Sequence, residues 1–86
     1  MIISYDGEAK ALYITLMYEF PVLTVAINDM VNVDISSGGA VIGLEVLSPA
    51  TTDWDVEKII TNYQIDFSVA DALIKCSERK EFFKDL

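Results

Sequence analysis

The feature that most constrains the fold is the segment Val31 to Leu47, which reads VNVDISSGGAVIGLEVL. Apolar and polar residues alternate in both of its halves, with the period of two that is typical of half-buried β-strands. The four residues Ser36 to Gly39 between the halves tolerate the positive φ angles of tight turns. The segment therefore predicts a β-hairpin. Its loop pairs Val33 either with Leu44 or with Ile42, and the sequence leaves both registers open.

Two earlier segments alternate in the same way and complete the predicted sheet. They read ALYITLMY over residues 11–18 and VLTVAIN over residues 22–28. The connections between them are short, and short connections favour sequential antiparallel neighbours. We therefore predict an α+β fold built on an antiparallel four-stranded β-meander, with Ile2 to Tyr5 as a fifth edge strand in the wider alternative.

The two faces of the predicted meander differ in chemistry. One face is almost wholly aliphatic, whereas the outer face mixes apolar and polar side chains. Gly43 lies inside a strand, where a glycine marks the close approach of another group, here either Tyr13 or a partner chain. The mixed composition suits an interface with a wet rim better than a catalytic pocket. The candidate interface residues are Tyr13, Met17, Asp34, Val41, Gly43 and Glu45.

After Pro49 the hydrophobic period changes to that of α-helices. Thr52 is followed by acidic residues and is predicted as the N-cap of a helix that runs to about Asn62. Ser68 predicts a second helix start, with Asp71 in the position of a capping-box acid. One or both helices are the expected cover of the aliphatic sheet face. The stripe of the second helix consists of Val69, Ala72, Leu73, Cys76, Lys80 and Phe83.

The 86 residues make one predicted domain, because a chain of this length forms a single modest core. The β-meander is expected over residues 1–47, and a helical C-terminal extension over residues 51–86. Residues 63–67 join the two helices and are predicted as a loop, with a short strand as the alternative.

The chain is acidic, with 14 Asp and Glu against 6 Lys and Arg and a formal net charge of -8. Phosphate binding needs clustered Lys and Arg, so we expect no direct contact with nucleic acid. No apolar run approaches the roughly 20 residues of a membrane span. Ser4 and Asp6 interrupt the apolar start that a signal peptide needs, and one cysteine excludes an internal disulfide framework. These features predict a cytoplasmic protein without a membrane partner.

Catalytic and metal-binding signatures are sparse in this sequence. Histidine, the commonest general base and metal ligand, is absent, and one cysteine does not build a zinc site. The acids Asp53, Asp55 and Glu57 have the spacing that opens an EF-hand loop. Lys58 and Gln64 stand where that loop needs Gly and Glu. We therefore predict no catalytic, cofactor-binding or metal-binding residue, and a protein that is not an enzyme.

Two further chemical hypotheses stay open. Asp34 and Glu45 are expected near each other on adjacent strands, and with Tyr13 they offer a small-molecule or catalytic site at an oligomer interface. Cys76 on the helical stripe is predicted as a small buried residue, with a reactive thiol as the alternative.

The segments Tyr5 to Leu16 and Val31 to Leu47 together resemble the YuzE-like family of small prokaryotic proteins, a domain of unknown function. Lys10 departs from the family pattern, which has an acid there, and the tail from Thr51 onward is longer than in a typical member. The resemblance implies a small β-meander protein without established catalytic residues. By analogy with acidic antitoxins, it also implies a small basic, toxin-like partner. The matching positions are Tyr5, Asp6, Ala11, Leu12, Tyr13, Ile14, Val31, Val33, Asp34, Gly39, Gly43, Leu44, Glu45, Val46 and Leu47.

The hydrophobic fraction of 52% favours an apolar contact between chains in addition to one small core. The first functional hypothesis is therefore a non-enzymatic interaction module that forms a homodimer or a higher homo-oligomer. The alternatives are an acidic antitoxin-like partner of a small basic protein, and the small-molecule or enzymatic site around Asp34 and Glu45.

Overall fold

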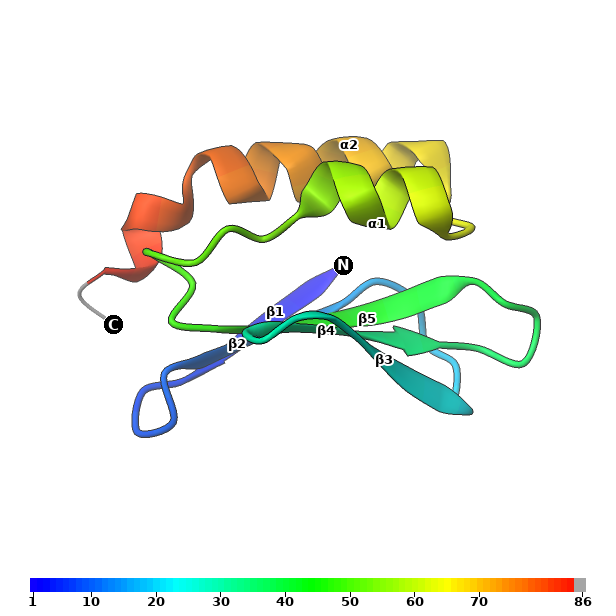
Figure 1. Cartoon of the computed structure of the whole chain (residues 1–86), viewed down its shortest axis with the longest axis horizontal. Helices are drawn as coiled ribbons and strands as arrows, with labels where there is room; N and C mark the ends of the chain where they lie inside the picture. The colour runs from blue at the N-terminus through cyan, green and yellow to red at the C-terminus, as the bar shows by residue number, and fades with distance from the viewer. Residues whose placement is uncertain (85–86) are drawn as a thin grey trace.

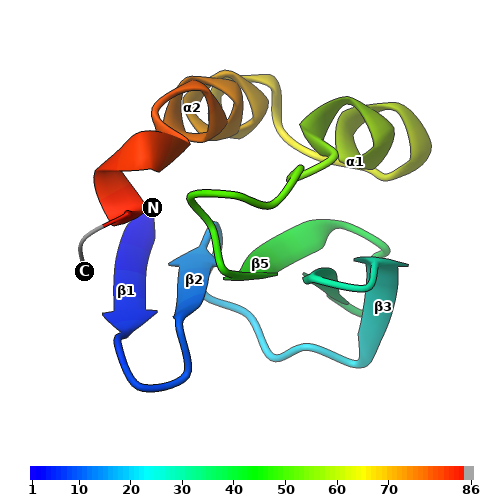
Figure 2. The ribbon, with the colours of Figure 1, turned by 60° about the vertical axis from the view of Figure 1, so that its left-hand side comes forward.

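The computed structural model describes residues 1–84 and has two layers, a five-stranded sheet and a pair of helices over it (Figure 1). The helices are α1 (Val56–Asn62) and α2 (Phe67–Glu78), and α2 is followed by the 3-10 helix η1 (Lys80–Phe83). Both helices lie on the same face of the sheet in the two views (Figure 1, Figure 2). The predicted α+β class, with helices over one sheet face, is confirmed. The strands are β1 (Ile2–Asp6), β2 (Ala11–Thr15), β3 (Leu23–Asn28), β4 (Val31–Ile35) and β5 (Val41–Leu47).

All neighbouring strands are antiparallel, and their order across the sheet is β1-β2-β5-β4-β3. The consecutive strands β3, β4 and β5 lie side by side as a meander, and β1 is the predicted edge strand. One adjacency differs from the expectation of sequential neighbours, because β2 pairs with β5 and not with β3. The link of residues 16–22 therefore carries the chain from β2 to the far edge of the sheet.

The length of this link makes the crossing possible. Three strand spacings of about 4.8 Å separate β2 from β3, roughly 14 Å in all, and a link of this length reaches farther when extended at about 3.3 Å per residue. The link is also held as it crosses. The N–H of Leu16 donates to the carbonyl of Ile42, and the N–H of Val22 donates to the carbonyl of Ile35, both at 2.9 Å.

The hairpin of β4 and β5 pairs Val33 with Leu44, one of the two registers that the sequence leaves open. The register then shifts between Asp34 and Ile35, so that Ile35 pairs with Val41 and β5 carries one extra residue. Such a bulge moves the side chains beyond it to the opposite face. The predicted position of Val41 on the outer face is therefore wrong, because Val41 is 1% exposed and belongs to the hydrophobic core.

The hydrophobic core lies between the sheet and the helices. Alternate residues of β2 and β4 point into it, and Trp54 enters it from the segment that precedes α1. The buried indole N–H of Trp54 donates to the carbonyl of Pro49 at 2.8 Å. Phe83 of η1 closes one end of the core, with its ring 6.1 Å from that of Trp54 and 6.4 Å from that of Tyr5. Fully buried core residues include Leu12, Ile14, Val31, Val33, Leu44, Val46, Ile59 and Leu73.

The first helix starts later than the sequence predicts. Asp55 is its N-cap, and the predicted cap Thr52 instead donates its hydroxyl to the carbonyl of Leu47 at 2.7 Å. A contact from another part of the chain accompanies this choice, because Nδ2 of Asn28 donates to Oδ2 of Asp55 at 2.8 Å. The side chain of Asp55 makes no capping hydrogen bond to the helix, so its carboxylate is held by Asn28 and does not cap the first turn.

The N-cap of the second helix lies two residues earlier than predicted, so that Phe67, predicted as part of the loop, belongs to α2. Asp66 is its N-cap, and its carboxylate accepts a hydrogen bond from the N–H of Ser68 at 3.0 Å. Hydrogen bonds from the hydroxyl and the N–H of Ser68, the predicted cap, lower the pKa of Asp66. The last residues of the predicted helical extension, Asp85 and Leu86, lie outside the described residues.

The connection between the two helices is a loop, as predicted, with one bridge to the sheet. Ala40 and Gln64 form an isolated parallel bridge, and the N–H of Val41 donates to the carbonyl of Gln64 at 2.9 Å. This bridge ties the helical layer to the start of β5.

Truncating Leu73 will test whether α2 covers the sheet. Leu73 is fully buried, whereas its neighbour Ile74 on the same helix is 38% exposed. We expect Leu73→Ala to lower the free energy of unfolding by about 2 to 5 kcal/mol, because it leaves a cavity between the layers. Ile74→Ala is the matched control, and its loss should stay below about 1.5 kcal/mol. Urea denaturation measures both, and equal losses would contradict the packing of α2.

Candidate functional site

Four of the predicted interface residues meet on the outer face of the sheet, opposite the helices. Tyr13 on β2 pairs with Glu45 on β5, and Asp34 on β4 pairs with Gly43 on β5. Their neighbours along the strands, such as Leu12, lie in the core, so alternation turns these four positions away from the helices. The fold therefore gathers predicted residues from three strands.

Tyr13 crosses over Gly43 to reach Asp34. Its phenol hydroxyl donates a hydrogen bond to Oδ2 of Asp34. A Cβ on Gly43 would lie 3.0 Å from Cζ of Tyr13 and closer still to its phenol oxygen. The ring thus occupies the space that any other residue at this position needs. Of the two groups that we considered for close approach to Gly43, Tyr13 is the one found.

Asp34 and Glu45 each have a further partner. Oδ1 of Asp34 accepts a hydrogen bond from Oγ1 of Thr24 at 2.6 Å. Oε1 of Glu45 accepts a longer one from Nδ2 of Asn32 at 3.4 Å. Thr24 and Asn32 are the residues of this group that the sequence analysis did not single out, although strand alternation places both on this face. We call the five residues that line this shallow hollow of about 190 Å³ the outer-face cluster: Tyr13, Thr24, Asn32, Asp34 and Glu45.

The outer-face cluster keeps the phenol of Tyr13 neutral. Burial, the hydrogen bond to Asp34 and the charges of Asp34 and Glu45 raise the pKa of Tyr13 to about 12. Among residues 1–84, the carboxylates of Asp34 and Glu45 form no salt bridge. The ion pair found among these residues joins Lys75 and Asp71 on α2. The cluster therefore presents negative charge and hydrogen-bond acceptors, with both oxygens of Asp34 already in use.

Met17, another predicted interface residue, begins an exposed apolar stretch outside the cluster. It lies in the link of residues 16–22, which passes from β2 to β3 across the start of β5 and the end of β4. In this link Tyr18 is 83% exposed and Phe20 is 93% exposed. The sequence analysis singled out neither, because it placed Tyr18 at the end of the strand predicted over residues 11–18 and Phe20 in the short connection that follows. The sequence does contain a sign of this surface, because large apolar residues such as Tyr18 and Phe20 stand where a short connection is usually polar.

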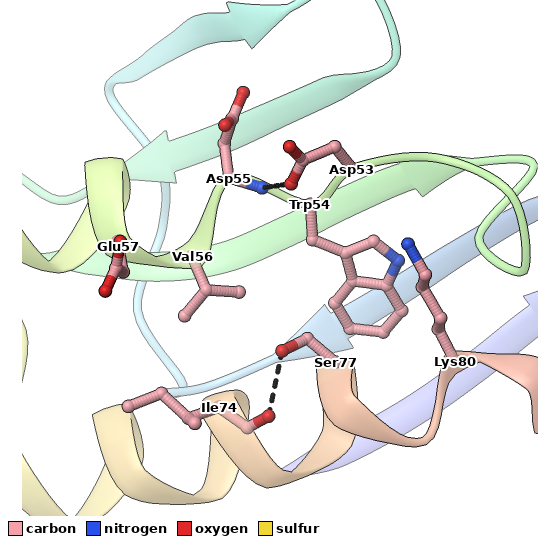
Figure 3. A pocket seen from close by; sticks show the side chains of 8 residues that line it. All are labelled: Asp53, Trp54, Asp55, Val56, Glu57, Ile74, Ser77 and Lys80. Atoms are coloured by element: carbon pink, nitrogen blue, oxygen red, sulfur yellow. Dashed lines mark hydrogen bonds between the residues drawn. The ribbon is translucent and has the colours of Figure 1, made fainter.

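A larger hollow of about 350 Å³ lies between α2 and the segment before α1 (Figure 3). Several of its polar groups have partners within the chain. Oγ of Ser77 donates to a carbonyl of its own helix at 2.8 Å, and Nζ of Lys80 donates to the carbonyl of Thr52 at 2.9 Å. Asp53 accepts a hydrogen bond from the N–H of Asp55 at 3.0 Å. These contacts order the segment that leads into α1.

Two further kinds of site, a metal centre and a reactive thiol, were considered for residues 1–84. Among residues 1–84, no group of three or more Cys, Asp or Glu side chains is arranged to hold a metal ion. Cys76 is a free thiol that packs against the core, and burial raises its pKa, which lowers its thiolate fraction. Over the described residues, no helix combines the length and the apolar character needed to cross a membrane.

Comparison with known proteins gives one match. A family model described as "Protein of unknown function (DUF2283)" matches residues 2–48. The matched region spans the five strands and includes the outer-face cluster and the link. No curated protein and no solved structure matches the chain significantly.

Substituting Gly43 will test the crossing of Tyr13. Gly43→Ala places a methyl group where the phenol ring lies, so we expect it to displace Tyr13 from Asp34 and to lower the free energy of unfolding by about 1 to 3 kcal/mol. Tyr13→Phe removes the oxygen nearest to that methyl group, and in this background Gly43→Ala should cost less. Urea unfolding of both single variants and the double variant measures the coupling. Strictly additive losses would contradict the crossing.

The titration of Tyr13 provides a pH-dependent test. Its pKa in the folded chain, about 12, lies above the ordinary value of 10.0. Folding therefore favours the protonated phenol, and this stabilisation is complete below pH 10 and is lost as the pH rises towards 12. Ultraviolet titration of tyrosinate should show a late phase that Asp34→Asn moves to lower pH. If the late phase persists in Tyr13→Phe, its assignment is wrong.

Proposed function

We propose that this chain, which belongs to the DUF2283 family of proteins of unknown function, is a protein interaction module that assembles with copies of itself. The observation that carries this proposal is the exposed apolar surface of the link. Tyr18 and Phe20 in the link, and Val22 and Leu23 where it enters β3, are all exposed. Several large apolar side chains exposed within one short segment favour an interaction site there.

The distribution of charge favours contact at this place. The chain carries 14 acidic and 6 basic residues, so two copies repel each other over most of their surfaces. The stretch of residues 17–28, which contains most of the link and all of β3, holds Glu19 as its single charged residue. Two copies can approach each other here with little repulsion, and burial of the aromatic rings drives the contact.

The outer-face cluster borders this surface and supports the proposal in a different way. The hydroxyl groups of Tyr13 and Thr24 satisfy both oxygens of Asp34, so this part of the face is rigid and polar. It therefore resembles the wet rim of an interface, with the apolar link as its centre. The small-molecule or catalytic site around Asp34 and Glu45 stays a prediction.

A second candidate function is a complex with a small basic protein. The net charge of -8 favours it, and so does the YuzE-like resemblance of residues 5–47 with its antitoxin analogy. Either function is expected in the cytoplasm, since one cysteine supports no internal disulfide framework.

Sedimentation equilibrium of the purified chain at micromolar concentration tests self-assembly. We expect a mass that is an integral multiple of 9.6 kDa. Association should tighten as salt rises, because ions screen the repulsion between acidic copies and leave the apolar contact intact. A monomer at every concentration and salt level would contradict the proposal.

Native mass spectrometry of the tagged chain, purified gently from cells, separates the two candidates. A self-assembled module appears as multiples of one mass. A stoichiometric small basic partner that leaves at high salt would favour the second candidate instead, because charge attraction weakens with ionic strength.

A further inference from the structure

We infer that two copies of this chain join through a reciprocal contact, in which Phe20 of each copy enters a hollow on the link of the other. This inference rests on the proposed function and specifies how the interaction module meets its own copy. The hollow has a volume of about 280 Å³ and is lined by Thr15, Met17, Tyr18, Glu19 and Phe20.

Phe20 has the properties of an interface anchor. Its side chain is 93% exposed, and it precedes Pro21, whose ring fixes φ and stiffens the backbone. Both ends of the link are tied to the sheet. The N–H of Met17 donates to the carbonyl of Ile42 at 3.2 Å, and the N–H of Val22 donates to the end of β4 at 2.9 Å. An aromatic ring on an anchored backbone loses little conformational freedom on binding, which favours affinity.

The hollow suits an aromatic ring in size and in charge. A cavity of about 150 Å³ holds a benzene molecule, and this hollow of about 280 Å³ is larger and open to the surface. Of its lining residues, Glu19 alone carries a charge. A neutral ring therefore fits the hollow better than a charged side chain does.

A second copy is the occupant that the geometry favours. A two-fold contact uses the same patch on both copies, so the patch must hold both a protruding group and the hollow that receives it. The link contains both, because Phe20 protrudes beside the hollow that it borders. The two Phe20 rings then meet near the two-fold axis. Glu19 is the single charged residue that lines the hollow, and residues 20–28 carry no charge, so few of the acidic groups of this chain of net charge -8 meet in the contact.

The first test removes the ring. Phe20→Ala should raise the dissociation constant of the dimer at least about 30-fold, the effect of a hot-spot residue. Phe67→Ala is the matched control, because Phe67 is also a phenylalanine and is 88% exposed at the start of α2. We expect it to change the constant less than threefold by sedimentation velocity. Both residues lie at the surface, so neither substitution threatens the fold.

The second test uses the reciprocity of the contact. Thr15→Gln places a longer neutral side chain in the hollow, and covering its amide with a ring leaves polar groups unpaired. Phe20→Ala loses the ring and leaves four of the five residues that line the hollow, whereas Thr15→Gln keeps the ring and fills the hollow. Each variant alone should dissociate. An equal mixture should form a heterodimer, because the ring of the Thr15→Gln copy enters the open hollow of the Phe20→Ala copy. Native mass spectrometry distinguishes the two chains by mass.

The outcomes separate this inference from the function on which it rests. A wild-type chain that is monomeric throughout overturns both. A wild-type oligomer that Phe20→Ala weakens no more than Phe67→Ala leaves the interaction module in place and overturns the reciprocal contact. A mixture of Phe20→Ala and Thr15→Gln that stays monomeric also overturns it, provided that circular dichroism shows both variants folded.

Discussion

Removal of the aliphatic sheet face from water is the constraint on which the rest of this structure depends. Side chains such as Leu12, Val33 and Leu44 line that face and are fully buried. Both helices follow the last strand in the chain, so the chain must fold back over the sheet to cover these side chains. Trp54 leads this return and satisfies its indole N–H on Pro49, which lets a large ring enter the core without an unpaired donor.

The outer face meets a different requirement, because its polar groups must be satisfied without a covering layer. Tyr13, Thr24 and Asp34 do this with hydrogen bonds among themselves that span four neighbouring strands, from β2 over β5 and β4 to β3. The arrangement depends on Gly43, since only a residue without a side chain leaves room for the phenol ring. The pairing explains why a glycine stands in the middle of a central strand, where it otherwise weakens the sheet.

The exposed aromatic residues are a consequence of the strand order. Because β5 takes the place beside β2, the chain must cross the ends of two strands before it reaches β3. This crossing carries Tyr18 and Phe20 outside the core, on a backbone that is held by hydrogen bonds. A segment without regular secondary structure thereby exposes large aromatic side chains, and the proposed interaction module uses them as its contact surface.

The sequence by itself determined the faces of the strands, the helical cover and the gathering of Tyr13, Asp34 and Glu45 on the outer face. Alternation and turn chemistry are local properties, so they can be read from neighbouring residues. Only the tertiary structure decided that Val41 lies in the core and that Phe20 is exposed. A bulge and a strand order depend on hydrogen bonds between residues that are distant in the chain, and no local pattern specifies those partners.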